Sequence, residues 1–141
     1  MVRNKIVIDA NFFLALYNPS DQLHSSAFKM AERLQEGNVS IILPILIFSE
    51  VMTLVSQRIG KAQALEIGDE IRTNKKIRIE YLNSRSESEI YSVFSEIKKK
   101  NMSYADCSIL TTIKKYDVRK LLSFDKKDFG SFQDSFSFTF Y

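Results

Sequence analysis

The stretch "KIVIDANFFLAL", residues 5–16, places an aspartate inside a run of apolar residues. Val7 and Ile8 precede Asp9, and the residues at positions 12–16 are all apolar. Burying a carboxylate in such surroundings costs roughly several kcal/mol unless it is paired, hydrogen-bonded or bound to a metal. Asp9 therefore needs a partner that other parts of the chain must supply.

The same stretch starts an alternation of strands and helices that continues along the chain. Its first part, Lys5–Asp9, is rich in β-branched residues and predicts a buried strand, whereas residues 11–17 predict a helix. Further strands are expected over 39–43, 76–81, 118–124 and 135–141, and further helices over 20–36, 44–59, 61–73, 86–100 and 104–116. Such alternation predicts an α/β fold with a mainly parallel sheet covered on both faces.

Length and composition indicate one ordinary domain over residues 1–141. The chain is 45% hydrophobic and 26% charged, which is enough to build a core. The longest apolar stretch, residues 41–55, is interrupted by polar residues and falls short of the roughly 20 residues that span a bilayer. The N-terminus has no signal-peptide pattern, and the one cysteine excludes an internal disulfide. We therefore expect a cytoplasmic protein with no membrane partner.

Charge is distributed unevenly along the chain. Residues 1–70 hold 6 Lys and Arg against 8 Asp and Glu, whereas residues 71–141 hold 14 against 9. Pairs and triplets of basic residues recur in the second half, for example at positions 98–100 and 126–127. They are compatible with solvated helix ends and turns, or with a surface that binds phosphates.

Three further acids, like Asp9, lie in apolar surroundings in the sequence. Asp125 ends the expected strand "KLLSFD", so it belongs to the same edge of a parallel sheet as Asp9, the edge where ligands of such sheets bind. Glu50 lies in "IILPILIFSEVMTLV" and Asp106 in "SYADCSIL", both in apolar surroundings. The four acids are candidates for one shared site.

Each of these acids also has a structural explanation. Asp9 or Asn11 could cap the first helix, and Asp125 could belong to a turn. Glu50 could pair with an arginine, and Asp106 could form a capping box with Ser103. The candidate arginines for Glu50 are Arg58 and Arg3.

A shared site nevertheless explains the four acids together. Two carboxylates about 5 Å apart repel by roughly 3 kcal/mol at an effective dielectric of 20, so a cluster needs protonation or a cation. Oxygen ligands without His or Cys favour Mg²⁺ or Mn²⁺. The only histidine, His24, is expected on the surface of the second helix, and Cys107 is expected in the core.

Four motifs in this order resemble the PIN domain family, which includes the VapC-type toxin ribonucleases. The motifs are "VIDANFFLAL", "FSEV", "SYADCSIL" and "LLSFDKKDF", and together they cover essentially the whole chain. The resemblance implies a single PIN-like domain, a three-layer α/β/α sandwich that cleaves RNA in a metal-dependent reaction. Asp9, Glu50, Asp106 and Asp125 match the four acids of the family by position.

The resemblance also assigns residues around the acids. Asn11 matches a polar position that often supports the first acid, and Asp128 lies beside the site in the stretched tail "DKKDF". Ala10 stands where many members carry Thr or Ser, which removes a possible hydroxyl hydrogen bond but no ligand.

The expected reaction is hydrolysis of an RNA phosphodiester bond. Asp9 and Asp106 are expected to be the principal metal ligands, with Glu50 and Asp125 binding a second ion or acting through water. Ser123 is expected to hydrogen-bond either a ligand carboxylate or a phosphate. The basic residues expected to attract the RNA backbone are Lys126, Lys127 and Lys75.

Other expectations concern partners and alternatives. Tyr104 and Phe12 could stack on bases, although aromatic residues more often belong to the core. By family resemblance we expect an antitoxin protein as partner and a homodimer. The alternatives left open are a PIN nuclease of RNA processing, a DNA 5′-nuclease-like phosphoesterase, and a catalytically silent RNA-binding or assembly module.

Overall fold

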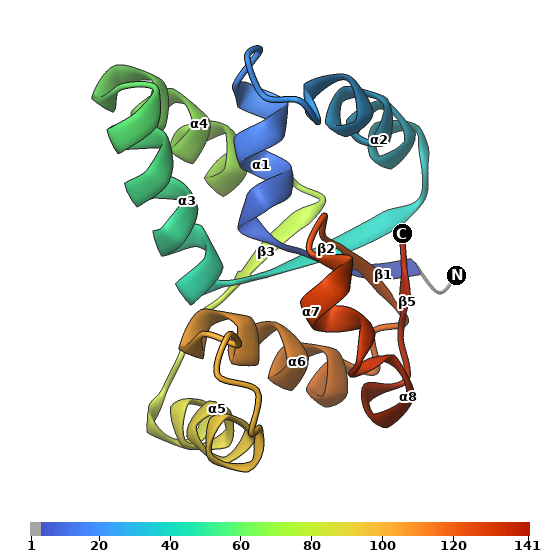
Figure 1. Ribbon diagram of the computed structural model, residues 1–141. Coiled ribbons are helices and arrows are strands. Elements are labelled where there is room, and N and C mark those ends of the chain that lie inside the picture. The colour runs from blue at the N-terminus through green and yellow to red at the C-terminus, as the bar shows by residue number, and fades with distance from the viewer. Residues whose placement is uncertain (1–3) are drawn as a thin grey trace.

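The computed structural model describes residues 4–141 and arranges them as a sheet between two layers of helices (Figure 1). The strands are β1 (Asn4–Ile8), β2 (Val39–Pro44), β3 (Ile77–Glu80), β4 (Lys120–Leu122) and β5 (Thr139–Phe140). The helices are α1 (Ala10–Tyr17), α2 (His24–Glu36), α3 (Ile45–Arg58), α4 (Lys61–Thr73), α5 (Ser84–Glu96), α6 (Tyr104–Tyr116), α7 (Lys126–Gly130) and α8 (Gln133–Phe136).

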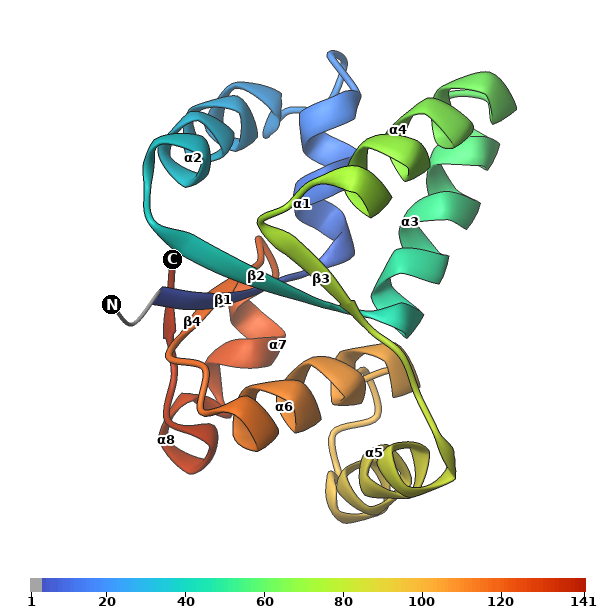
Figure 2. The same cartoon turned by 180° about the vertical axis from the view of Figure 1, so that it is seen from behind.

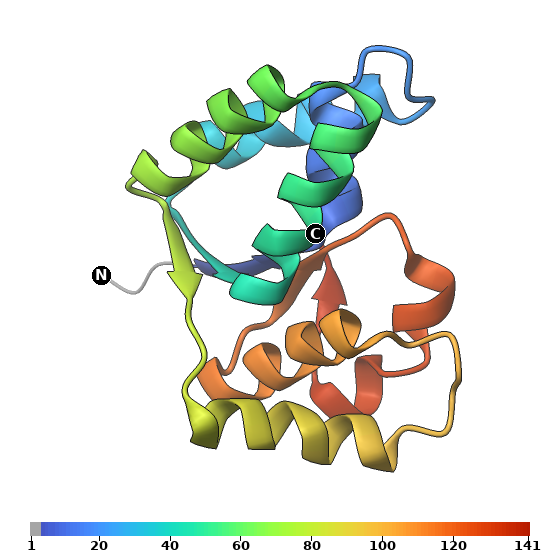
Figure 3. The ribbon, with the colours of Figure 1, turned by 90° about the vertical axis from the view of Figure 1, so that its left-hand side faces the viewer.

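The sheet has the order β3-β2-β1-β4-β5, and every pair of neighbouring strands is parallel. Helices α1 to α4 lie on one side of the sheet and α5 to α8 on the other (Figures 1 and 3). The expected three-layer α/β/α sandwich is therefore confirmed. Because all strands point the same way, their carboxyl ends form one edge of the molecule.

The direction in which successive strands are added to the sheet reverses at β1. From β1 the chain builds outward through β2 to β3, and then returns to place β4 on the other side of β1 (Figure 2). The segments after β1 and β4 therefore leave the sheet towards opposite layers, α1 above and α7 below in Figure 1. A parallel sheet opens a crevice at such a reversal point.

Buried β-branched and aliphatic residues hold the layers together. The side chains of Ile6, Val7 and Ile8 in β1 are fully buried, as expected for a central strand covered on both faces. In α3, Ile47, Val51 and Val55 recur every four residues and form its buried stripe. Burying an aliphatic side chain of this size contributes about 1.5–3 kcal/mol.

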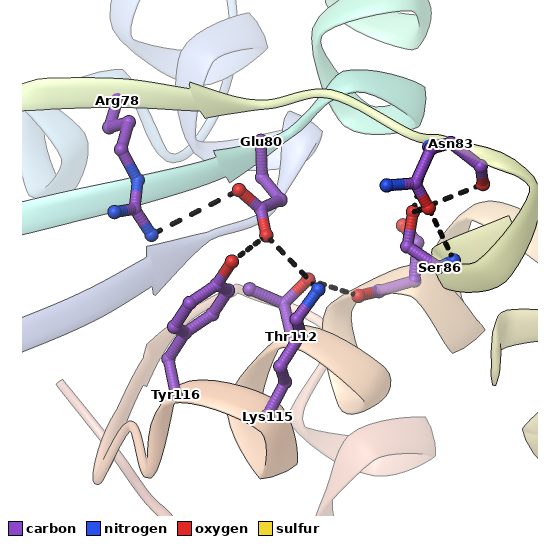
Figure 4. A network of polar contacts seen from close by, with 8 residues as sticks. Arg78, Glu80, Asn83, Ser86, Thr112, Lys115 and Tyr116 are labelled. Atoms are coloured by element: carbon purple, nitrogen blue, oxygen red, sulfur yellow. Dashed lines mark hydrogen bonds and ion pairs between the residues drawn. The ribbon is translucent and has the colours of Figure 1, made fainter.

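A polar network joins α6 to the edge strand β3 (Figure 4). The Glu80 carboxylate accepts a hydrogen bond from the Tyr116 hydroxyl and lies 3.8 Å from Lys115 Nζ. The guanidinium of Arg78 stacks over the Tyr116 ring, 4.8 Å from its centroid. Donating to Glu80 raises the pKa of the Tyr116 hydroxyl. The network fixes the end of α6 and so helps to position Asp106 near the start of the same helix.

The bounds of two predicted helices need correction. The helix expected from residue 20 begins at His24, because the Asn18 and Asp21 side chains accept the backbone N–H groups of Ser20 and Leu23 and hold a turn. The helix expected over 86–100 is α5, which begins earlier, after the Asn83 capping box, and ends at Glu96.

The strand expected over 135–141 is wrong for its first residues. Residues 133–136 form α8, Ser137 adopts a left-handed conformation with φ 57°, and only Thr139–Phe140 pair with β4. The apolar alternation reflects two separate ring contacts: Phe132 packs on Phe136, and Phe138 packs on Phe140. The short helix α7 was not predicted either, since five residues are too few to show a helical period.

No helix within residues 4–141 is long and apolar enough to cross a membrane.

Gly60 gives a test of the link between α3 and α4. It adopts φ 153° and ψ 159°, a region open essentially to glycine alone, and its carbonyl accepts the Ala64 N–H of the first turn of α4. We expect Gly60→Ala to lower the free energy of unfolding by about 1–3 kcal/mol in urea denaturation. In Gly130→Ala the new Cβ would approach only Gln133 Oε1, at 3.9 Å, so that control should be nearly neutral. Equal stability of the two variants would contradict this conformation at Gly60.

Candidate active site

The segments that follow β1 and β4 meet at the carboxyl edge of the sheet. Asp9 comes directly after β1, and its backbone N–H donates to the Leu122 carbonyl at 2.9 Å. Its side chain caps α1 and is only 6% exposed. Oδ1 accepts the Ala10 N–H at 2.7 Å, and Oδ2 accepts the Ser123 hydroxyl at 2.7 Å. Both oxygens of the buried carboxylate therefore have a donor.

Ser123 connects Asp9 to the loop after β4. Besides donating to Asp9, its Oγ accepts Nδ2 of Asn11 at 3.3 Å and the backbone N–H of Asp125 at 3.0 Å. Asn11 Oδ1 in turn accepts the Phe124 N–H at 3.1 Å. The predicted contact of Ser123 with a site carboxylate is confirmed. Asn11 supports Asp9 through Ser123 and not by direct contact.

Asp125 and Asp128 lie at the start of α7. Asp125 caps this helix, its Oδ1 accepting the Asp128 N–H at 3.2 Å. Asp128 forms an ion pair with Lys99 Nζ at 3.1 Å, and the same ammonium lies 3.3 Å from the Asp128 carbonyl. The basic triplet at 98–100 was visible in the sequence, but the partner of Lys99, 29 residues away, was not.

The other two acids come from α3 and α6, whose first turns lie close together in Figure 1. Asp106 is in the first turn of α6 and completes the predicted capping box: Oδ2 accepts the Ser103 N–H, and Ser103 Oγ accepts the Asp106 N–H. Glu50 is partly buried, and its side chain makes no hydrogen bond or ion pair with residues 4–141. Its suggested pairing with Arg58 is therefore wrong, and Arg3 lies outside the described residues.

The pKa values show that these acids affect one another. Burial raises the pKa of Asp9 from 3.8 to about 6; hydrogen bonds from Ser123 and Ala10 oppose the rise, and the charges of Asp106 and Glu50 add to it. Burial and then Asp106 raise the pKa of Glu50.

The repulsion extends from Asp106 to the acids of the loop after β4. Burial raises the pKa of Asp106, its hydrogen bonds with Ser103 lower it, and the charges of Asp125 and Asp128 raise it further. Asp106 thus lies within electrostatic reach of the other three predicted acids and of Asp128.

The chemistry of these donors fits a divalent cation. All are carboxylate oxygens, which Mg²⁺ and Mn²⁺ prefer, and a cation would relieve the mutual repulsion. No three His, Cys, Asp or Glu side chains among residues 4–141 are close enough to hold an ion as they stand. The carboxylates therefore interact through space and form an open cluster.

The other residues that were expected to contact RNA lie in different parts of the molecule. Lys126 and Lys127 are exposed at the start of α7, next to Asp125. Lys75 precedes β3 and lies at the amino edge of the sheet, so the prediction that it borders the acids is wrong. Phe12 is 2% exposed and belongs to the core, whereas Tyr104 is partly exposed two residues before Asp106.

The raised pKa of Asp9 predicts how the metal-free protein responds to pH. The folded state retains the Asp9 proton up to about pH 6, whereas the unfolded state loses it near 3.8, so this group lowers stability as pH rises through that window. A shift of this size corresponds to about 3 kcal/mol at neutral pH. We expect Asp9→Asn to raise the free energy of unfolding by about 1–3 kcal/mol at pH 7.5 with a chelator.

The advantage of Asp9→Asn should disappear below about pH 4, in denaturation curves measured across the range. Asp134→Asn, on the exposed start of α8, provides a control that should not show this pH dependence. A loss of stability in Asp9→Asn at pH 7.5 would contradict the raised pKa of Asp9.

Comparisons with known proteins address the family and the fold of this chain. The sequence matches the model of the PIN domain over residues 6–133. Comparison with the curated proteins finds no match.

Solved structures of toxin–antitoxin proteins share the fold. VapC20 from Mycobacterium tuberculosis, a sarcin–ricin loop cleaving toxin, superposes with TM-score 0.78 at 21% identity, over 89% of this chain and 93% of that one. VapBC2 from Rickettsia felis, bound to a DNA fragment from its promoter, gives TM-score 0.67 at 15% identity, over 97% of each chain. VapBC-1 from nontypeable Haemophilus influenzae gives 0.66 at 13%, over 97% of this chain and 96% of that one.

At these identities the structural likeness establishes the fold alone, and the sequence match establishes the family. The resemblance expected from the four motifs is confirmed: this chain belongs to the PIN domain family.

Proposed function

We propose that the chain is a metal-dependent endoribonuclease and the toxin of a toxin–antitoxin pair. The observation that carries the proposal is the convergence of Asp9, Glu50, Asp106 and Asp125 at the carboxyl edge of a PIN domain sheet. A scaffold has no use for four carboxylates placed so that Asp106 repels each of the other three, which argues against a silent RNA-binding or assembly module.

Asp9 and Asp106 are the residues that would hold Mg²⁺ or Mn²⁺, with Glu50 and Asp125 completing the set. A bound divalent ion supplies an activated water for hydrolysis and neutralises charge on the phosphoryl oxygens. The Ser123 hydroxyl and the Asn11 amide keep the Asp9 carboxylate in place, since they connect it to the loop that carries Asp125. Loss of the Asp9 proton above about pH 6 leaves the carboxylate charged for this role.

Basic residues beside the acids provide the attraction that a polyanion needs. Carboxylates repel a nucleic acid backbone, so the substrate must be held by cations next to them. Lys126 and Lys127 are exposed and adjoin Asp125. The Lys99 ammonium is already paired with Asp128, and it reduces the negative charge of the site without being free for phosphate.

The proposals of a toxin role and of its partners rest on the solved structures that share this fold. The structures that share this fold include a toxin described as cleaving the sarcin–ricin loop, and two VapBC proteins, one of them bound to its promoter DNA. We extend to this chain RNA as the substrate, an antitoxin protein as the partner, a homodimer and a cytoplasmic location.

Incubation with mixed cellular RNA tests the activity. With Mn²⁺ or Mg²⁺ the protein should cut RNA internally, and a chelator should abolish the cutting. Asp106→Asn should lower the rate by about two orders of magnitude or more, because it removes a ligand of the ion. Asp134→Asn, an exposed acid on α8, should cleave like wild type.

Mapping the cut ends distinguishes specific cleavage from contamination. Cleavage by Asp106→Asn at the wild-type rate, or cleavage that persists in chelator, would contradict the proposal. Single-stranded and flapped DNA serve as competing substrates, and faster cleavage of DNA than RNA would favour the DNA 5′-nuclease alternative.

A further inference from the structure

Three aromatic side chains form a partly exposed face beside the acids. Tyr91 and Phe94 lie on α5 and are 63% and 43% exposed, and Tyr104 is the first residue of α6. The Phe94 and Tyr104 rings pack edge to face, with centroids 5.4 Å apart and an interplanar angle of 68°. We call Tyr91, Phe94 and Tyr104 the aromatic face.

The aromatic face is separate from the core contact of α5. That helix packs on the rest of the protein through Ile90, with Val93 and Ile97 partly buried beside it. Tyr91 and Phe94 therefore expose apolar surface that the packing of α5 does not require. Single exposed apolar residues are common, but here two neighbours on one helix face combine with a third ring from another helix.

The Tyr104 ring is held in one orientation. Its hydroxyl donates to the Glu87 carboxylate and lies 3.3 Å from the Glu87 carbonyl. Glu87, Tyr91 and Phe94 follow one another at helical spacing, so they share one side of α5. A fixed ring loses little conformational freedom when another flat group packs on it.

The aromatic face borders both the acids and unpaired cations. Tyr104 precedes Asp106 by two residues in the first turn of α6. The loop between α5 and α6 carries Lys98 and Lys100, which are exposed and make no hydrogen bond or ion pair with the described part of the chain. Lys99 of the same loop contacts Asp128, so the loop lies against α7 and the site.

From this arrangement we infer that the aromatic face stacks on unpaired bases of the RNA substrate next to the bond that is cut, while Lys98 and Lys100 hold its backbone. The inference rests on the proposed ribonuclease function and adds a contact for the bases. Aromatic rings with adjacent lysines are the combination that binds single-stranded nucleic acid.

Charge complementarity favours RNA over a protein as the occupant. The loop between α5 and α6 carries two free lysines, Lys98 and Lys100, which complement a chain of phosphates, and the Glu87 carboxylate beside the rings is already bound by the Tyr104 hydroxyl. The carboxylates beyond Tyr104 repel the same phosphates, so stacking provides an attraction that does not depend on charge. A second copy of the chain is the competing occupant, and the experiment below identifies it.

Binding of fluorescein-labelled single-stranded RNA, measured by anisotropy, tests the inference. All proteins carry Asp9→Asn, which prevents cleavage and lies on another segment from the rings. Phe94→Leu should weaken binding roughly 5- to 100-fold, the range found for removing one stacked aromatic, and Phe94→Trp should restore it. Phe28→Leu is the matched control, since Phe28 is 53% exposed on α2 in the other layer, and it should bind like the parent.

An RNA in which the bases are replaced by abasic sites shows whether stacking is the cause. It should bind the Phe94→Leu protein and its parent equally, because the backbone contacts remain. Affinity of Phe94→Leu equal to that of Phe28→Leu would overturn the inference, as would the same loss on abasic RNA.

Two further measurements separate the possible outcomes: the molar mass by light scattering, and RNA cleavage. A dimer that Phe94→Leu converts to a monomer would identify the aromatic face as a subunit interface and overturn the inference. If the protein without Asp9→Asn cleaves RNA while Phe94→Leu binds it unchanged, the ribonuclease function stands and only the stacking contact fails. If the protein without Asp9→Asn neither binds nor cleaves RNA, the proposed function fails as well.

Discussion

A buried negative charge at the junction of β1 and β4 is the constraint on which the site depends. The Asp9 carboxylate is almost fully buried, and two donors, the Ala10 N–H and the Ser123 hydroxyl, compensate only part of the cost. The pKa of Asp9 stays raised, so ionisation of this carboxyl in the protein alone is less favourable than that of a free aspartate. A bound cation would offset the cost of burying this charge. Ser123 and Asn11 keep the two loops together around the carboxylate.

The structural and chemical explanations of these acids hold at the same time. Asp9 and Asp125 cap α1 and α7, and Asp106 forms the capping box of α6. Partial positive charge at a helix N-terminus favours a carboxylate by about 0.3–1 kcal/mol, so the helix starts offset part of the repulsion among the acids. Capping therefore explains how the protein tolerates the cluster, and not why the cluster exists. The Glu50 side chain caps no helix in the described residues, and the shared site is the role that we propose for it.

The sequence predicted what depends on local pattern and missed what depends on distant partners. The buried strand β1, the Ser103 capping box and the parallel sheet follow from β-branched runs, turn chemistry and the alternation of elements. The four acids could be found because carboxylates in apolar runs are rare. The Lys99–Asp128 ion pair could not be predicted, since the tertiary fold alone brings the two residues together. The strand predicted over 135–141 was wrong for its first residues because alternating phenylalanines fit a strand as well as a helix followed by a short strand.

The pKa of the Asp9 carboxyl, followed by ¹³C NMR titration with and without Mg²⁺, tests the central claim most directly. Without metal the account predicts a pKa of about 6, and with saturating Mg²⁺ a pKa well below its ordinary value of 3.8, because the attraction of the cation outweighs the cost of burial and the repulsion of the other acids. A pKa close to 3.8 that Mg²⁺ does not move would show that neither burial nor a cation acts on the Asp9 carboxyl.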